Sequence, residues 1–100
     1  MSILDIRLTP EFRRWLSDLT DHRAVARIVK RIDRMAIGNP GDIKSVGGRV
    51  MEMRIDYGPG YRVYYVRRGA AIIVLLCGGD KRMQAGDIAK AKALATELQD

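Results

Sequence analysis

The sequence predicts an α+β fold, in which an antiparallel sheet forms a meander, two N-terminal helices pack on one of its faces, and a third helix ends the chain. The two helical patterns come first and the main strand patterns follow them, and this segregation is typical of α+β proteins. The apolar run 70–77 indicates a strand that is buried on both faces, at the centre of the sheet. Residues 60–67 alternate in character, so one face is expected to carry Tyr61, Val63 and Tyr65 and the other Arg62, Tyr64 and Val66.

The N-terminal part predicts a short strand or extended lead-in at 3–8, followed by two helices. Thr9 can cap the first helix, and Pro10 suits its first position. The apolar face of this helix consists of Phe12, Trp15, Leu16 and Leu19. The second helix is expected over 22–37, capped by Asp21 and ended by the glycines and proline of 38–42. Its apolar stripe consists of Val25, Ile28, Val29, Ile32 and either Met35 or Ala36.

The middle of the chain predicts two further strands, a short irregular one at 43–46 and a regular one at 50–57. Alternation along the regular strand is expected to turn Met51, Met53, Ile55 and Tyr57 to the core and Glu52, Arg54 and Asp56 to solvent. A tight hairpin at 58–60 would then bring Arg54 beside Arg62. Both guanidinium groups and the Tyr64 hydroxyl are therefore expected to share one exposed polar face of the sheet.

The last part of the chain predicts a helix over about 83–98, with an apolar side formed by Ile88, Ala91, Leu94, Ala95 and Leu98. Gly86 disfavours the first turn, so the helix could also begin only at Asp87. Before it, the glycine pair 78–79 is expected to release the chain from the sheet, and Asp80 can cap the segment that follows.

The composition predicts a single soluble cytoplasmic domain over residues 1–100. No apolar run approaches the roughly 20 residues that a membrane-spanning helix needs, and the N-terminus lacks the pattern of a signal peptide. The lone Cys77 excludes an internal disulfide and fits a core thiol in a reducing compartment. His22 is the sole histidine, so no cluster of metal ligands is expected, and the sequence implies no cofactor.

The charge is strongly basic, with a formal net charge of +6 and arginine at thirteen of the eighteen basic positions. Arginine favours bidentate contacts with phosphate, so a polyanionic partner is expected. One face of the second helix concentrates these cations, with only Asp33 to offset them: Arg23, Arg27, Lys30, Arg31 and Arg34. Three interpretations remain open for this face: a solvated helix surface, a track for a phosphate backbone, or a dock for an acidic inhibitor.

Three motifs carry a resemblance to a known family. They are FRRWLSDLTDHRAVARIVKRIDRMAIGNPGD, MRIDYGPGYRVYY and LLCGGDKRMQAGDIAKA, and together they run from Phe12 to Ala91. On these motifs, and on their order, the chain resembles the RelE/ParE superfamily of toxins from bacterial type II toxin–antitoxin modules. Within that superfamily it is most similar to the HigB-like "addiction module killer" branch.

The resemblance implies a RelE-like fold, an antiparallel sheet flanked by helices. It implies a metal-independent endoribonuclease that cleaves mRNA in the A site of the ribosome, by attack of an RNA 2′-hydroxyl on the adjacent phosphate. It also implies a cognate antitoxin, encoded beside the toxin and usually carrying a helix-turn-helix domain. The toxin–antitoxin complex would bind operator DNA through that domain, and no membrane is involved.

The resemblance also implies roles for individual residues. Arg62, in the YRV element, matches the strand arginine of the superfamily and is expected to stabilise the phosphate. On the predicted strand pairing, Arg54 could be a second clamp, and Lys81 lies at the end of the strand 70–77, where it could bind phosphate or act as an acid. RelE itself uses a lysine pair on the preceding strand and a tyrosine near its C-terminus, and this chain has neither. The general base is therefore unassigned, and the candidates are Tyr57, Tyr61, Tyr64 and His22, of which Tyr64 points to the proposed face.

Other interpretations compete with catalysis. Arg54 and Arg62 could form cross-strand salt bridges with Glu52 and Asp56. The same fold also serves ParE-type inhibitors of DNA gyrase, and a non-toxic member would only bind its antitoxin and operator DNA.

Overall fold

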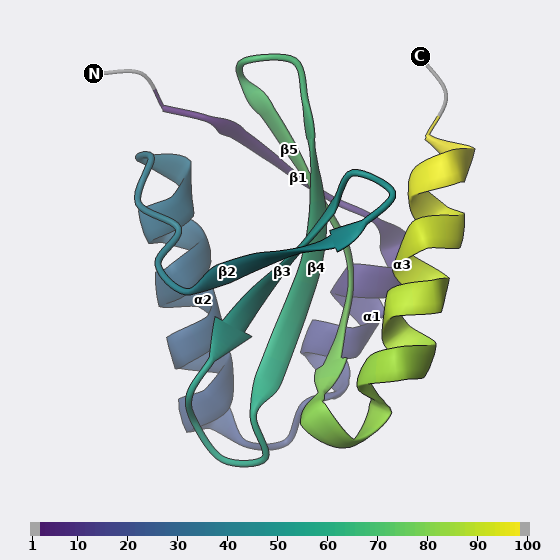
Figure 1. Ribbon diagram of the computed structural model, residues 1–100. Helices are drawn as coiled ribbons and strands as arrows, with labels where there is room; N and C mark the ends of the chain where they lie inside the picture. Colours follow the sequence, from purple (N-terminus) through teal and green to yellow (C-terminus); the bar gives the residue numbers. More distant parts are fainter. Residues whose placement is uncertain (1–2, 99–100) are drawn as a thin grey trace.

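The computed structural model describes residues 3–98, which form a five-stranded sheet and three α-helices (Figure 1). The α+β class expected from the sequence is confirmed. The elements follow in the order β1 (Asp5–Leu8), α1 (Pro10–Asp18), α2 (His22–Ala36), β2 (Ile43–Gly47), β3 (Val50–Ile55), β4 (Tyr61–Arg68), β5 (Ile72–Asp80), a 3-10 turn η1 (Lys81–Met83) and α3 (Gln84–Glu97).

The sheet is mixed, which corrects the expectation of a wholly antiparallel meander. Its strand order is β1-β5-β4-β3-β2, so β4 and not β5 holds the middle position. Strands β2 to β5 are antiparallel neighbours, but β1 pairs with β5 in parallel, from Asp5 opposite Ile72 to Leu8 opposite Leu75. Between β1 and β5 the chain passes through α1, α2 and the strands β2 to β4, and this long connection permits parallel pairing of the first strand with the last.

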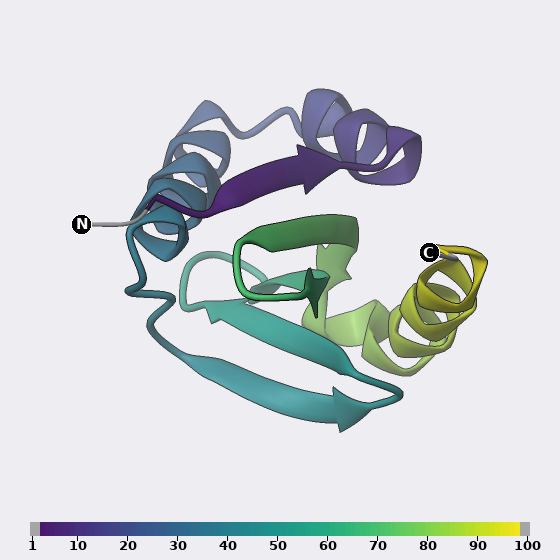
Figure 2. The same cartoon turned by 90° about the horizontal axis from the view of Figure 1, so that it is seen from above.

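Helices cover both faces of the sheet. Helices α1 and α2 lie on one side and α3 lies on the other (Figure 2). The first side holds a core built around Phe12, Ile28 and Met35 from the helices and Met53, Val63 and Leu75 from the strands. The second side holds a separate core in which Ala91 and Ala95 of α3 pack on Val50, Tyr64, Val66 and Leu76. The face that carries Tyr64 is therefore buried beneath α3.

Side-chain caps fix the starts of α1 and α2, as the sequence predicts. The Thr9 hydroxyl accepts a hydrogen bond from the Phe12 amide at 3.0 Å and donates to the Leu76 carbonyl at 2.6 Å, which ties α1 to β5. The Asp21 carboxylate accepts from the amides of Arg23 and Ala24. Helix α2 ends one residue earlier than expected, at Ala36, and its predicted stripe is wrong at Val29, which is 40% exposed.

The glycine pair 78–79 has a different role from the one expected. Strand β5 begins at Ile72 and continues through both glycines to Asp80, so the pair does not release the chain from the sheet. A Cβ at Gly78 would collide with the Trp15 ring, and a Cβ at Gly79 would collide with the Asp87 carboxylate. Glycine is needed here because α1 and α3 approach the strand closely. Helix α3 begins at Gln84, so Gly86 lies inside its first turn and does not delay it.

Candidate functional site

An open hollow of about 440 Å³ gathers three of the four predicted catalytic residues, Arg54, Arg62 and Lys81. Arg54 comes from the end of β3, Arg62 from the start of β4, and Lys81 from the turn η1 that follows β5. We call it the cationic hollow, and its other lining residues are Asp42, Ile55, Asp56, Gly60 and Tyr61. The β3–β4 hairpin therefore brings the two arginines together as the sequence predicts, and the end of β5 adds the lysine.

Arg54 and Arg62 face each other directly across the two strands. Like charges in this position destabilise a sheet unless other groups compensate for them. Each guanidinium group has one carboxylate partner: Arg54 pairs with Asp42 at 3.0 Å, and Arg62 pairs with Glu52 at 3.3 Å. The cross-strand salt bridge considered above thus exists for Arg62 with Glu52, whereas Arg54 pairs with the exposed Asp42 and not with Asp56. The Nε atoms of both arginines are buried and have no acceptor.

Glu52 is fully buried, so the prediction that it faces solvent is wrong. Three donors converge on its carboxylate: Arg62, the Tyr64 hydroxyl at 3.1 Å and the Gln84 side-chain amide at 2.8 Å. Gln84 is the first residue of α3, so Glu52 joins two strands and a helix behind the cationic hollow. Sequence reasoning named Glu52 only as a possible salt-bridge partner on an exposed face, and it missed Gln84. Val50 and Val66, which share the face of Glu52, were the signal that this face is covered.

Tyr64 lies in this buried network and not on an exposed polar face, which corrects its predicted position. Its side chain is 0% exposed, and its hydroxyl donates to Glu52. Burial, followed by the neighbouring Glu52 carboxylate, raises the pKa of Tyr64 well above its usual range. A phenol held neutral, with its proton already engaged, is unsuited to accept a proton from a substrate. Its placement therefore supports a structural role and does not support a role as general base.

Tyr61 takes a place in the cationic hollow, although alternation predicts only that it faces the core. Its ring packs edge-on against Trp15, with the ring centroids 6.2 Å apart. Burial raises the pKa of Tyr61, and the carboxylates of Asp21 and Asp80 add to the effect. Tyr61 therefore stays protonated at neutral pH and can act as a proton donor. His22, another candidate base, is exposed at the start of α2 and does not line the hollow.

The predicted basic face of α2 divides into one structural arginine and four exposed cations. Arg31 donates hydrogen bonds to the carbonyls of Arg54 at 2.7 Å and Pro40 at 2.9 Å, and so fastens α2 to the end of β3 and to the loop before β2. Burial lowers the pKa of Arg31. The exposed side chains are those of Arg23, Arg27, Lys30 and Arg34.

The exposed cations of α2 lead directly to the cationic hollow. Arg27, Lys30 and Arg34 line a shallow depression together with Ile55 and Asp56, and the latter two also line the hollow. The Arg27 guanidinium also lies over the Tyr57 ring, 4.5 Å from its centroid, which holds it beside the β3–β4 hairpin. One continuous surface therefore runs from the basic face of α2 to Arg54, Arg62 and Lys81.

The remaining chemistry of the described chain is limited. Within residues 3–98, no group of three or more His, Cys, Asp or Glu side chains is arranged to hold a metal ion. Cys77 is buried, as expected for a core thiol, and its burial raises its pKa to about 11, so it is not a reactive thiolate. None of the helices in that part of the chain combines the length and the apolar character needed to cross a bilayer.

Fold and surface define a small, arginine-rich α+β protein with a cationic hollow at one end of its central hairpin. By sequence, the chain belongs to the family described as phage derived protein Gp49-like (DUF891), whose model matches residues 14–99. This RelE-like family is associated with toxin–antitoxin modules, which supports the superfamily resemblance. The chain is also 50% identical to an uncharacterized protein of Haemophilus influenzae over 95 residues, which is 95% of this chain and 96% of that protein.

Proposed function

We propose that this protein is the toxin of a type II toxin–antitoxin module, of the HigB-like branch, and that it cleaves mRNA in the ribosomal A site without a metal ion. Family membership supports the toxin role. The observation that carries the nuclease activity is the opposed pair Arg54 and Arg62, which the fold sets in a hollow together with Lys81. Two like charges in direct opposition are costly for folding, and a phosphate between them would relieve the repulsion.

In the proposed reaction, the 2′-oxygen of one nucleotide forms a bond to the adjacent phosphorus, and the bond from phosphorus to the 5′-oxygen of the next nucleotide breaks. The products are a 2′,3′-cyclic phosphate and a free 5′-hydroxyl. Arg62 and Arg54 stabilise the charge that develops on the pentavalent phosphate. Lys81 binds the same phosphate or gives a proton to the departing 5′-oxygen.

The proton of the attacking 2′-hydroxyl needs an acceptor in the hollow. Asp56 lines the hollow, and its exposed carboxylate can be reached by a 2′-hydroxyl bound there. Tyr61 is protonated, and Tyr64 is buried behind the hollow. We therefore assign the role of general base to Asp56 and place Tyr61 with Lys81 among the proton donors.

Three exposed cations of α2, Arg27, Lys30 and Arg34, would guide the RNA backbone toward the hollow, because they line a depression that shares Ile55 and Asp56 with it. A cognate antitoxin, encoded next to this chain and carrying a helix-turn-helix domain, would neutralise the toxin. The complex of the two would bind operator DNA through the antitoxin.

Primer extension on a reporter mRNA tests the activity, with purified protein added in the presence and absence of translating ribosomes. The proposal predicts cuts that require ribosomes and that disappear with Lys81→Ala, whose exposed side chain is not needed for folding. Arg13→Ala is the matched control, because Arg13 is an exposed cation on α1 that does not line the hollow. Cuts in free RNA would contradict the ribosome dependence. The absence of cuts in either tube, together with inhibition of gyrase supercoiling, would replace the nuclease with a gyrase inhibitor.

A further inference from the structure

A second depression lies on the side of the sheet that α1 and α2 cover, beside the C-terminal end of α2. It encloses about 440 Å³, within the range of about 300–1,000 Å³ that is common for binding pockets. We call it the apolar groove. Its lining comes from the end of α2 and the loop that follows, and from residues in or beside all five strands. The apolar side chains that line it are Leu4, Met35, Ile43, Met51, Tyr65 and Ile73.

Part of this lining remains open because no helix covers it. Leu4, Ile43 and Met51 are only half-buried, although each packs against the first core. The charged residues at the groove are Arg49 and Arg67, and none of its described lining residues is acidic. An apolar floor with a purely basic rim favours a ligand of matching character, apolar at its centre and acidic at its flanks.

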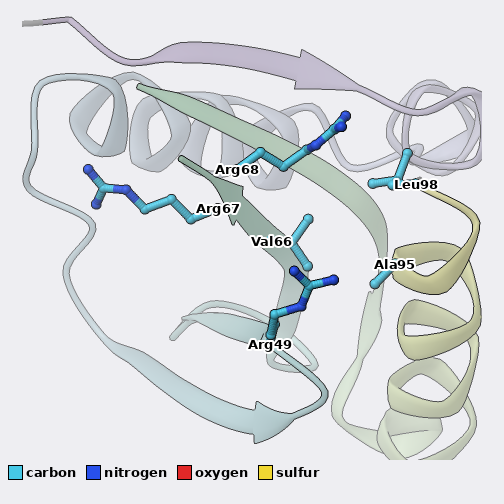
Figure 3. Close-up of a pocket in the computed structure, with 6 residues that line it drawn as sticks. All are labelled: Arg49, Val66, Arg67, Arg68, Ala95 and Leu98. Atoms are coloured by element: carbon cyan, nitrogen blue, oxygen red, sulfur yellow. The ribbon is translucent and has the colours of Figure 1, made fainter. Parts of the chain in front are cut away.

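The two rim arginines differ in direction. Arg49 lies in the β2–β3 turn with a φ of 65°, a left-handed conformation that is uncommon for a residue other than glycine. It borders the groove, but its side chain turns toward Val66 and Ala95 in a neighbouring pocket on the α3 side (Figure 3). Arg67 and its neighbour Arg68 point to opposite sides of β4 (Figure 3). Arg67 therefore extends toward the groove side of the sheet, where its guanidinium donates to the Ala70 carbonyl at 2.9 Å.

We propose that the apolar groove receives an amphipathic, acidic segment of the antitoxin, with its apolar side chains on the floor and a carboxylate at Arg67. The inference rests on the proposed toxin–antitoxin function. It commits to an acidic protein segment because a net charge of +6 and a basic rim would repel a second copy of this chain. An amphipathic segment laid in an apolar groove is a common mode of peptide recognition.

The groove and the cationic hollow lie far apart on the β3–β4 hairpin. The groove uses the first residues of β3 and the last residues of β4, whereas the hollow uses the last residues of β3 and the first residues of β4. The two arginines of the hollow also point to the sheet face opposite the groove. A segment seated in the groove would therefore leave Arg62 uncovered, and antitoxin binding and RNA cleavage become separable by mutation.

The test measures the affinity of the purified product of the adjacent antitoxin gene for variants of the whole chain. Arg67→Glu and Met51→Glu are each expected to weaken binding at least tenfold while the toxin stays active, so that the antitoxin no longer protects growing cells. Arg13→Glu, a charge reversal on α1, is the matched control and should bind normally. A charge at the half-buried Met51 could unfold the protein. Arg67 is exposed, so Arg67→Glu is expected to stay folded and tests the groove independently.

Unchanged affinity for both folded variants would overturn the proposal. So would sedimentation data in which the chain alone dimerises and Met51→Glu makes it monomeric, because the groove would then be an interface between two copies. A crosslinker placed at Ile43 should capture an acidic, amphipathic peptide of the antitoxin, and capture of a basic or wholly polar peptide would contradict the proposal. The affinity, sedimentation and crosslinking results do not depend on nuclease activity, so a failure of the groove and a failure of the catalytic assignment are distinguishable.

Discussion

Arg54 and Arg62 stand directly opposite each other on β3 and β4, and each is tied to a different carboxylate. The two carboxylate partners differ in burial. Asp42 lies at the surface, whereas Glu52 is fully buried and also receives hydrogen bonds from Tyr64 and Gln84. Arg62 is therefore held rigidly beside a more adaptable Arg54.

Replacement of Glu52 by alanine is expected to lower the free energy of unfolding by about 3–5 kcal/mol. The change leaves Arg62 and Tyr64 as buried donors without an acceptor, and breaking a buried ion pair has this cost. Asp42→Ala removes the exposed partner of Arg54, and its cost should not exceed about 1 kcal/mol. Urea unfolding of both variants provides the measurement. Equal losses of unfolding free energy would contradict the claim that the buried partner of Arg62 contributes more stability than the exposed partner of Arg54.

Gly79→Ala is expected to destabilise the protein by about 1–3 kcal/mol, because its methyl group needs the space that the Asp87 carboxylate occupies. In an Asp87→Ala background the same change should cost clearly less, so a double-mutant cycle measures the collision directly. Gly86→Ala is the matched control on α3. A methyl group at this position would meet nothing within 4 Å, and alanine in a helix should add about 0.5–1 kcal/mol of stability. Additive effects of the first two changes would refute the close approach.

We expect Asp87 to contribute to the pH dependence of the unfolding free energy. Burial raises the pKa of this carboxyl, and Asp80 adds to the effect. The folded state thus binds a proton more tightly than the unfolded state, and this group costs stability as the pH rises from about 4, the unfolded value, through the folded pKa. Asp87→Asn removes that cost. Its unfolding free energy relative to the unmodified protein should therefore increase between pH 4 and pH 7, and a constant difference would contradict the assignment.

Mutations on the basic face of α2 should separate an effect on stability from an effect on RNA binding. Arg31→Ala removes hydrogen bonds from a charged group to the carbonyls of Arg54 and Pro40, so we expect a loss of about 2–3 kcal/mol in unfolding free energy. Lys30→Ala is exposed and should stay within about 0.5 kcal/mol. We expect Lys30→Ala to weaken RNA binding more than Arg31→Ala does, because Lys30 faces the surface that leads to the hollow. Filter binding at two salt concentrations, beside thermal unfolding, separates the two effects.

Local signals in the sequence were enough to predict the helices and the central hairpin. Thr9 and Asp21 mark the starts of α1 and α2, and the glycines between β3 and β4 set the register that places Arg54 opposite Arg62. These features depend on residues close together in the chain, so pattern and capping rules capture them.

Features that depend on distant contacts were missed. Alternation along β3 shows two faces but not whether a helix covers the second one, so Glu52 and Tyr64 were expected at the surface. The pairing of β1 with β5 joins segments more than 60 residues apart, and a four-residue edge strand carries too little pattern to reveal its partner. The glycines at 78 and 79 looked like a turn because the close approach of Trp15 and Asp87 leaves no local trace.

The most direct test of the central claim is single-turnover cleavage of ribosome-bound mRNA by the protein and by Arg62→Ala and Arg13→Ala, at equal concentrations of folded chain. The account predicts a rate about 10²–10³-fold lower for Arg62→Ala, as for the loss of one group that stabilises a transition state, and an unchanged rate for Arg13→Ala. The fragments should end in a 2′,3′-cyclic phosphate. A folded Arg62→Ala protein that cleaves at the unmodified rate would contradict the account.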